Sequence, residues 1–199
     1  LSLAKSERIP LSIKNIENPN SQGTTFTVEP SLSKHPFKIV THNKRVGIIT
    51  FKIPEMATRS GFVGKLIEPF QEMGININDI LTEGTSISLT INLPPDLADQ
   101  NLLKEKISAA RTQLMKIKIG EEVFECDSKW VESKANVVII GDELKGAPGI
   151  LSAISAVLAN ENINIDGITH DLGQRKISLY VEKKDADRAV HALHKMFID

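Results

Sequence analysis

The feature that most constrains how this chain can fold is an internal duplication. The segment 60–91, SGFVGKLIEPFQEMGININDILTEGTSISLTI, returns at 147–181 as APGILSAISAVLANENINIDGITHDLGQRKISLYV. Gly61 and Gly149 are separated by 88 residues, whereas the apolar strands that begin at Val46 and Val137 are separated by 91. These spacings predict one module used twice, with a loop before the first helix that is three residues longer in copy one.

Each copy has the element order of a split βαβ unit. In copy one the predicted order is a strand, a helix, two strands around the Glu83-Gly84 turn, a second helix, and a fourth strand at 122–126. This order predicts an α+β fold made of two ferredoxin-like (βαββαβ) modules.

Copy two lacks a fourth strand, and the stretch 37–42, FKIVTH, is a spare one. A polar turn at Asn43-Lys44-Arg45 would separate it from the next strand. Because an unpaired sheet edge invites aggregation, we expect 37–42 to complete the second sheet. The first module would then be inserted in the second.

Composition argues against several classes of function. The 199 residues carry a net charge of −1 and 41% hydrophobic side chains, with no apolar run near the roughly 20 residues of a membrane span. Nucleic acid and membrane are therefore disfavoured as partners, and a cytoplasmic location is expected. The single cysteine, Cys126, excludes an internal disulfide and lies in a strand-like stretch, which favours a buried structural thiol.

Three stretches resemble the paired ACT modules that form the regulatory half of aspartate kinase. IPLSIKNIENPNSQGTTF resembles the last strands of the amino-acid kinase domain of that family. MATRSGF with ININDILTEGTSISLTI resembles the first ACT module, and APGI through INIDGITHDLGQRKISL with AVHALHKMF resembles the second. The resemblance implies a tail of the kinase domain and a linker at 1–30, a strand at 37–42 that completes the second module, a first module at 45–127 and a second at 134–199.

The resemblance implies a regulatory rather than a catalytic fragment. The kinase domain, which uses ATP and Mg to phosphorylate aspartate, would lie mostly before Leu1, since no glycine-rich phosphate loop followed by lysine occurs in the chain. No catalytic residue, metal site or cofactor is expected in the fragment. An end product, lysine or threonine, would bind where the first modules of two subunits meet, which implies a homodimer.

The candidate effector-binding site lies in copy one. Helix N-termini favour anions, and Gly61 allows close approach of a ligand carboxylate. Mapping the family's site onto this sequence selects the loop, the helix start and the following strand: Met56, Arg59, Ser60, Gly61, Phe62, Val63, Ile77, Asn78, Asp79, Thr82 and Glu83.

One position departs from the family pattern. Asn78 stands where an aspartate is usual, while copy two keeps Asp166. Either Glu83 or Asp79 replaces the missing charge, or the effector is threonine, whose hydroxyl group needs no charged partner. Strand alternation places Asn78 and Asp79 on opposite faces, so that only one of them can touch a given ligand.

Other interpretations stay open. The chain could be a free-standing amino-acid-sensing subunit. A ferredoxin-like fold also hosts RNA-binding domains, which need aromatic side chains on their central strands, but SISLTI and KISLYV offer only Tyr180. Gly61 could serve only a tight connection, with Phe62 in the core. His191 and His194 have a metal-binding spacing but no third ligand nearby, so solvent-facing histidines are favoured.

Overall fold

The computed structural model describes residues 6–26, 37–141, 144, 148–170, 173 and 175–198. The chain divides into two compact units, Leu1–Lys34 and His35–Asp199. Residues 1–5 and 27–30 of the predicted tail and linker lie outside the described residues.

The first unit contains a two-stranded hairpin. Strands β1 (Leu11–Ile13) and β2 (Thr24–Phe26) pair antiparallel. The extended segments predicted here are therefore present. Ile16 is 94% exposed and Ile13 is 60% exposed, so the hairpin does not bury these side chains.

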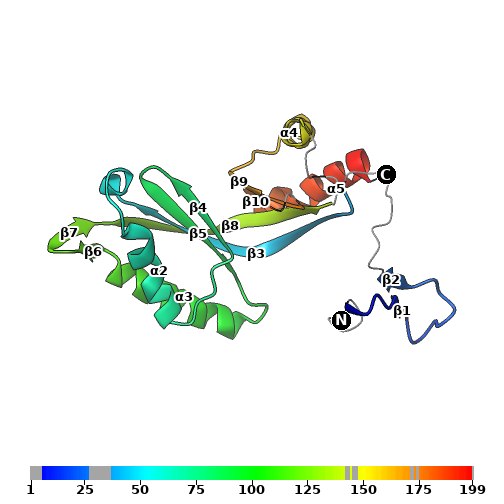
Figure 1. Ribbon diagram of the computed structural model, residues 1–199, viewed down its shortest axis with the longest axis horizontal. Helices are drawn as coiled ribbons and strands as arrows, with labels where there is room; N and C mark the ends of the chain where they lie inside the picture. The colour runs from blue at the N-terminus through cyan, green and yellow to red at the C-terminus, as the bar shows by residue number, and fades with distance from the viewer. Residues whose placement is uncertain are drawn as a thin grey trace. The chain divides into compact units, whose positions relative to one another are not determined.

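The second unit is built on one antiparallel sheet of six strands, in the order β4-β5-β3-β8-β10-β9. Its strands are β3 (Ile39–Lys52), β4 (Asp79–Glu83), β5 (Ser86–Asn92), β8 (Asp127–Ile140), β9 (Gly167–His170) and β10 (Lys176–Glu182). The two longest strands, β3 and β8, lie side by side at the centre (Figure 1).

Strands β3 and β8 each serve two cores. The first half of β3 pairs with the second half of β8, from Ile39 opposite Ile140 onward, and the remaining halves pair as far as Lys52 opposite Asp127. We call the first lobe the strand segments 46–52 and 127–131 with the elements that pack on them. The second lobe consists of the segments 39–43 and 134–140 with the elements that pack on those.

The first lobe buries one face of its strands beneath two helices. Helix α2 (Phe62–Glu72) follows a short 3-10 turn, η1 (Pro54–Ala57), and helix α3 (Leu97–Gln113) begins at Asp96, whose carboxylate accepts hydrogen bonds from the next turn's N–H groups. Both helices lie on the same side of the sheet (Figure 1). Their apolar faces form a core with Phe51 and Leu89.

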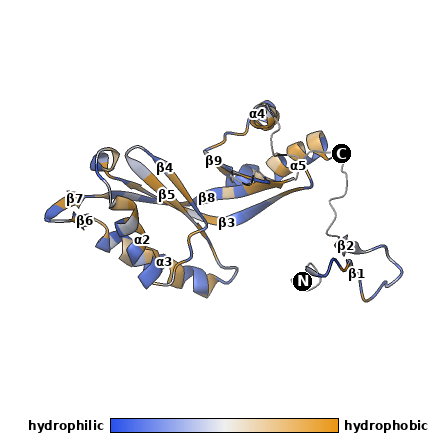
Figure 2. Cartoon of the chain, in the orientation of Figure 1, coloured by the Kyte–Doolittle hydropathy of each residue, from blue (hydrophilic) through white to orange (hydrophobic). Residues whose placement is uncertain are grey.

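The second lobe repeats this plan with helices α4 (Ile150–Asn160) and α5 (Ala186–Phe197), the latter preceded by the 3-10 turn η3 (Lys183–Asp185). Its core contains Val137 and Leu179. Helix α4 is coloured mostly hydrophobic in Figure 2, whereas much of α3 is coloured hydrophilic.

The register of the long strands shows that the predicted spacing of 91 residues between corresponding strands is wrong. Ile49 lies opposite Leu89 in the first lobe, and Val137 lies opposite Leu179 in the second. Ile49 therefore corresponds to Val137, and β3 corresponds to β8 over all 14 residues at a spacing of 88. The predicted three-residue extension of the first loop is wrong, because VGII and VVII are similar runs that point different residues into the core.

Two other predictions about strands are wrong. Asn43-Lys44-Arg45 is no turn, because β3 continues through it with shifts of register against β8. The stretch 122–126 is not the fourth strand, because β7 (Glu122–Glu125) pairs with β6 (Lys116–Ile119) in a separate hairpin. Residues 127–131 take the place beside β3 instead.

The stretch 37–42 joins the second sheet, as predicted. Phe37 is buried in the second core, and residues 39–42 pair with 137–140. The second lobe therefore receives its fourth strand from a segment that precedes the whole first lobe.

Candidate functional site

The loop before helix α2 forms the first part of the predicted site. Met56 in η1 packs against the first core, whereas Arg59, Ser60 and Gly61 are exposed. Gly61 precedes the helix with a φ of 99°, a left-handed conformation that glycine adopts without strain, and no side chain caps the helix start. A small ligand can therefore approach the backbone here.

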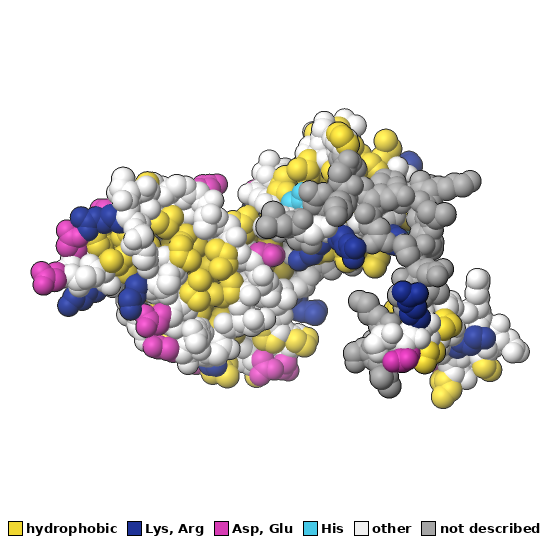
Figure 3. All heavy atoms as spheres, viewed as in Figure 1, with side chains coloured by type: hydrophobic (Ala, Val, Ile, Leu, Met, Phe, Trp, Pro, Cys, Tyr) yellow, Lys and Arg dark blue, Asp and Glu magenta, His cyan; other side chains and the backbone are white. Residues whose placement is uncertain are grey.

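The hairpin β6–β7 lies against this loop. Arg59 forms an ion pair with Glu122, and its guanidinium lies 5.3 Å from the centre of the Phe124 ring. Phe124 meets Phe62 edge to face, with ring centres 5.1 Å apart. Charged side chains of both signs gather at this end of the first lobe (Figure 3). A ligand carboxylate would compete with Glu122 for Arg59.

Glu122 and Phe124 are the residues that sequence reasoning missed. The sequence pattern predicts that they lie in a strand of the main sheet. Instead they lie in the β6–β7 hairpin, which only the folded chain places beside the loop. Phe62 is buried in the core, which was the alternative considered for it, while Val63 is 43% exposed.

The strand segment forms the second part of the predicted site. Ile77 packs against the same core as Met56, so the loop and this strand segment belong to the same lobe. The side chain of Asn78 is exposed, while the backbone N–H of Asn78 donates to the carbonyl oxygen of Thr90 (2.8 Å). Thr82 and Glu83 are exposed beside the turn into β5.

Asp79 faces the second lobe. The hydroxyl of Tyr180 on β10 donates to the Asp79 carboxylate (2.5 Å), and it lies 3.4 Å from Thr90 Oγ1. Tyr180 is only 1% exposed, and this burial together with the Asp79 carboxylate raises the pKa of its phenol well above the usual value. Asp79 is therefore part of a contact between the lobes.

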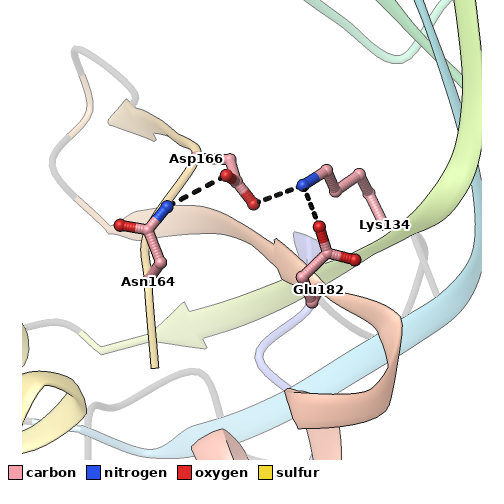
Figure 4. A network of polar contacts seen from close by, with 4 residues as sticks. All are labelled: Lys134, Asn164, Asp166 and Glu182. Atoms are coloured by element: carbon pink, nitrogen blue, oxygen red, sulfur yellow. Dashed lines mark hydrogen bonds and ion pairs between the residues drawn. The ribbon is translucent and has the colours of Figure 1, made fainter. Parts of the chain in front are cut away.

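The second lobe carries charge where the first is neutral. Lys134 donates to Asp166 (2.8 Å) and Glu182 (2.5 Å), and Asn164 donates to Asp166 (3.0 Å) (Figure 4). Burial lowers the pKa of Lys134, but the hydrogen bonds and charges of its two acidic partners outweigh this and raise the pKa overall.

The corresponding residues of the first lobe cannot form this network. At the spacing that the strand register sets, Asn78 corresponds to Asp166, Asn92 to Glu182, and buried Val46 to Lys134. All three charges are absent. The charged position of the second lobe is already neutralised, whereas Asn78 is free of such a network.

Within the described part of the chain, no group of three or more His, Cys, Asp or Glu side chains could hold a metal ion. None of the helices that the structure describes is both long and apolar enough to cross a bilayer.

Comparisons with known proteins agree with the fold. Residues 137–197 match the family model of the ACT domain. Aspartokinase 1, chloroplastic, of Arabidopsis thaliana is 26% identical over 196 residues, which are 98% of this chain and 33% of that protein. The chain thus spans about a third of the length of such curated relatives.

Two solved structures show the same architecture. E. coli aspartokinase III in complex with lysine and aspartate aligns with a TM-score of 0.70 at 21% identity, over 98% of this chain and 40% of that one. The regulatory subunit of aspartate kinase from Thermus thermophilus aligns with a TM-score of 0.63 at 19% identity, over 80% of this chain and 97% of that one. The predicted resemblance to the regulatory ACT region of aspartate kinase is confirmed.

Proposed function

We propose that this chain, which is similar over nearly its whole length to the C-terminal ACT regulatory region of aspartate kinases, is the allosteric part of such an enzyme. The observation that carries the proposal is this match, which includes a relative solved with lysine bound. The catalytic step, ATP-dependent phosphorylation of L-aspartate, would be performed by a kinase domain outside these residues. The 199 residues alone would be inactive.

The proposed effector is an end-product amino acid, lysine or threonine, bound between the loop 56–63 and the strand segment 77–83. The start of α2 would receive the carboxylate, because its N–H groups and the positive end of the helix dipole favour an anion. The side-chain amide of Asn78 would contact the polar end of the effector. Threonine needs no charged partner there, whereas lysine would need Glu83.

Binding can regulate only if the effector prefers one state of the protein. An effector shifts an equilibrium by its difference in affinity between two states and by no more. The Arg59–Glu122 pair supports such a difference, because a ligand carboxylate that recruits Arg59 would remove one of the contacts between the β6–β7 hairpin and the loop.

The topology supports two ACT modules, the first inserted in the second. We place them at 45–127 and 134–199, with 37–42 as the last strand of the second, and extend the first to residue 131 because β8 pairs with β3 there. The hairpin at 11–26 would belong to the end of the kinase domain. The homodimer through the modules remains part of the proposal on the family resemblance alone.

A free-standing regulatory subunit is the second candidate. The Thermus thermophilus regulatory subunit, which this chain covers to 97%, favours it. A cytoplasmic location remains a prediction in either case, since the Arabidopsis relative is named chloroplastic.

A thermal-shift panel of the twenty amino acids tests the function. An effector at 100 times its dissociation constant should raise the free energy of unfolding by about 2.7 kcal/mol. Lysine or threonine is expected to respond, and the response should weaken in Arg59→Ala and persist in Asp166→Ala. A panel without any response would overturn the effector assignment, and loss of the response only in Asp166→Ala would move the site to the second lobe.

A further inference from the structure

The duplication brings two equivalent residues together between the lobes. Thr90 on β5 lies opposite Asp79, and Tyr180 on β10 lies opposite Gly167, so Thr90 and Tyr180 hold the same place in the two copies. Both side chains are buried, and the Tyr180 hydroxyl lies 3.4 Å from Thr90 Oγ1. Strands β4 and β9 also contact each other, although they stand at opposite ends of the strand order. The sheet therefore curls until its two edges meet.

The same backbone hydrogen bond precedes the equivalent strands β4 and β9 in both lobes. The backbone N–H of Asn78 donates to the carbonyl oxygen of Thr90, and that of Asp166 donates to the carbonyl oxygen of Tyr180 (2.8 Å in each case). Asn78 belongs to the proposed effector site, whereas Asp166 belongs to the ion network with Lys134 (Figure 4). Thr90 and Tyr180 therefore each fix the residue in which the two lobes differ in charge.

Tyr180 is hydrogen-bonded to both of these strand starts. Its carbonyl oxygen accepts from Asp166 in its own lobe, and its hydroxyl donates to the Asp79 carboxylate in the other (2.5 Å). Asp79 directly follows Asn78, and its backbone N–H donates to Thr90 Oγ1 (2.9 Å). A hydrogen bond to a charged acceptor is stronger than one between neutral groups. A direct path of hydrogen bonds thus runs from Asp166 through Tyr180 to Asp79.

Glycine at position 167 lets the first lobe approach Tyr180 closely. A Cβ atom at Gly167 would lie 3.1 Å from a methyl carbon of Leu81 on β4 and 3.5 Å from the Tyr180 ring. Carbon atoms in good contact are about 3.5–4.0 Å apart, so a side chain at this position would press β4 away. Because closely packed groups transmit displacement rather than absorb it, a shift of Tyr180 is expected to move Asp79 as well.

We propose that Tyr180 is a positioning residue that couples the effector site of the first lobe to the ion network of the second. A ligand held by Asn78 changes the position of the adjoining Asp79, and Tyr180 transmits that change to Asp166. A change at Asp166 acts on Asn78 by the same path, because coupling between two sites is reciprocal. That Asn78 meets a ligand rests on the proposed function, whereas the connection between the lobes does not.

The connection is tested without a ligand, by the amide NMR signals of the 199-residue chain. Lys134→Met removes the shared cation of the second lobe and should shift the signals of Asn78 and Ile80 in the first. In a Tyr180→Phe background, which keeps the ring and loses only the hydroxyl, these shifts should be at least about twofold smaller, because the hydrogen-bonded path is broken. The Asp166 signal, which reports the substitution locally, should shift equally in both backgrounds.

A second variant breaks the same hydrogen bond from its other end. Asp79→Ala removes the acceptor and keeps the Tyr180 hydroxyl, so it should reduce the shifts at Asn78 and Ile80 as Tyr180→Phe does. This variant decides the matter if Tyr180→Phe does not fold. Shifts at Asn78 and Ile80 of the same size in both backgrounds would overturn the role of Tyr180. No shift there from Lys134→Met in the otherwise unchanged chain would overturn the connection itself.

A titration with L-lysine and with L-threonine separates this proposal from the proposed function. An amino acid that binds should shift the signals of both Asn78 and Asp166, and Tyr180→Phe should keep the first shift and lose most of the second. An undiminished shift at Asp166 in Tyr180→Phe would overturn the coupling. Absence of any shift with either amino acid would overturn the effector assignment alone, because the comparison with Lys134→Met still decides the connection.

Discussion

The two lobes share one scaffold but differ in charge just before the equivalent strands β4 and β9. In the second lobe, Lys134 is bound by Asp166 and Glu182, whereas the first lobe has Asn78 and Asn92 at the acidic positions and buried Val46 at the basic one. The acids of the second lobe are already satisfied from within. The difference teaches that a charged residue in one copy of a duplicated fold can serve stability, while the neutral residue at the same position of the other copy remains available for a ligand.

A second difference concerns the long strands. Trp130 covers Gly47 in the first lobe, and the corresponding residues of the second lobe are His42 and Ala135. His42 contacts Asp187 of α5 (2.7 Å), while the indole N–H of Trp130 donates to Glu132 (2.7 Å). In the first lobe, glycine at position 47 therefore makes room for the ring of Trp130.

The largest expected effect comes from filling this space. A Cβ atom at Gly47 would lie 2.0 Å from a ring atom of Trp130, so Gly47→Ala should lower the free energy of unfolding by about 2 kcal/mol. Urea unfolding measures it. Gly47→Ala with Trp130→His copies the second lobe and should recover most of the loss. A double variant no more stable than the single one would show that the ring is not the obstacle.

The next effect comes from the ion network of the second lobe. Lys134→Met leaves two carboxylates without their shared cation and should cost about 1–2 kcal/mol in urea unfolding at low salt. Asn78→Asp, which introduces an exposed acid at the matching position of the first lobe, should change stability by less than about 0.5 kcal/mol. Equal costs for the two variants would contradict the asymmetry.

A smaller effect is expected on ligand affinity. Asn78→Ala should weaken effector binding by about 1 kcal/mol, close to fivefold, because it removes one hydrogen-bonding side chain and leaves the backbone bond to Thr90 intact. Calorimetric titration measures it, with Asn164→Ala of the second lobe as the matched control. A fivefold loss in the control and none in Asn78→Ala would reverse the roles of the lobes.

The last prediction distinguishes the lobes by the pH dependence of their stability. Burial, with the charge of Asp127, raises the pKa of the Cys126 thiol to about 11. The thiol ionises more readily in the unfolded chain, near pH 8.5. Its contribution to stability is therefore complete below that pH and is lost as the pH rises through about 11.

This loss should appear as a negative slope of the free energy of unfolding against pH between pH 8 and 11, measured by urea unfolding at each pH. Cys126→Val should have a shallower slope, with the rest contributed by groups such as Tyr180, whose pKa is also raised. Identical slopes for the two proteins would contradict the assignment to Cys126.

Part of the fold and of the site could be read from the sequence. The helix and strand pair that follow Gly61 and Gly149, and the role of 37–42 as the missing strand of the second sheet, follow from periodicity, glycine positions and the duplication. The hairpin that covers Arg59 could not be read, because Glu122 and Phe124 look like any alternating strand. The contact of Asp79 with Tyr180 joins residues 101 positions apart, which no local pattern reports.

The sequence by itself determined that one α+β module occurs twice, because the helix starts at Gly61 and Gly149 and the strand pairs after them repeat their side-chain periods. Only the tertiary structure decided the strand register, the passage of β3 through Asn43–Arg45 and the curling that brings β4 to β9. The physical reason is that local periodicity specifies which face of a strand is apolar. The partner strand, and with it the register, is selected by packing between segments far apart in the chain.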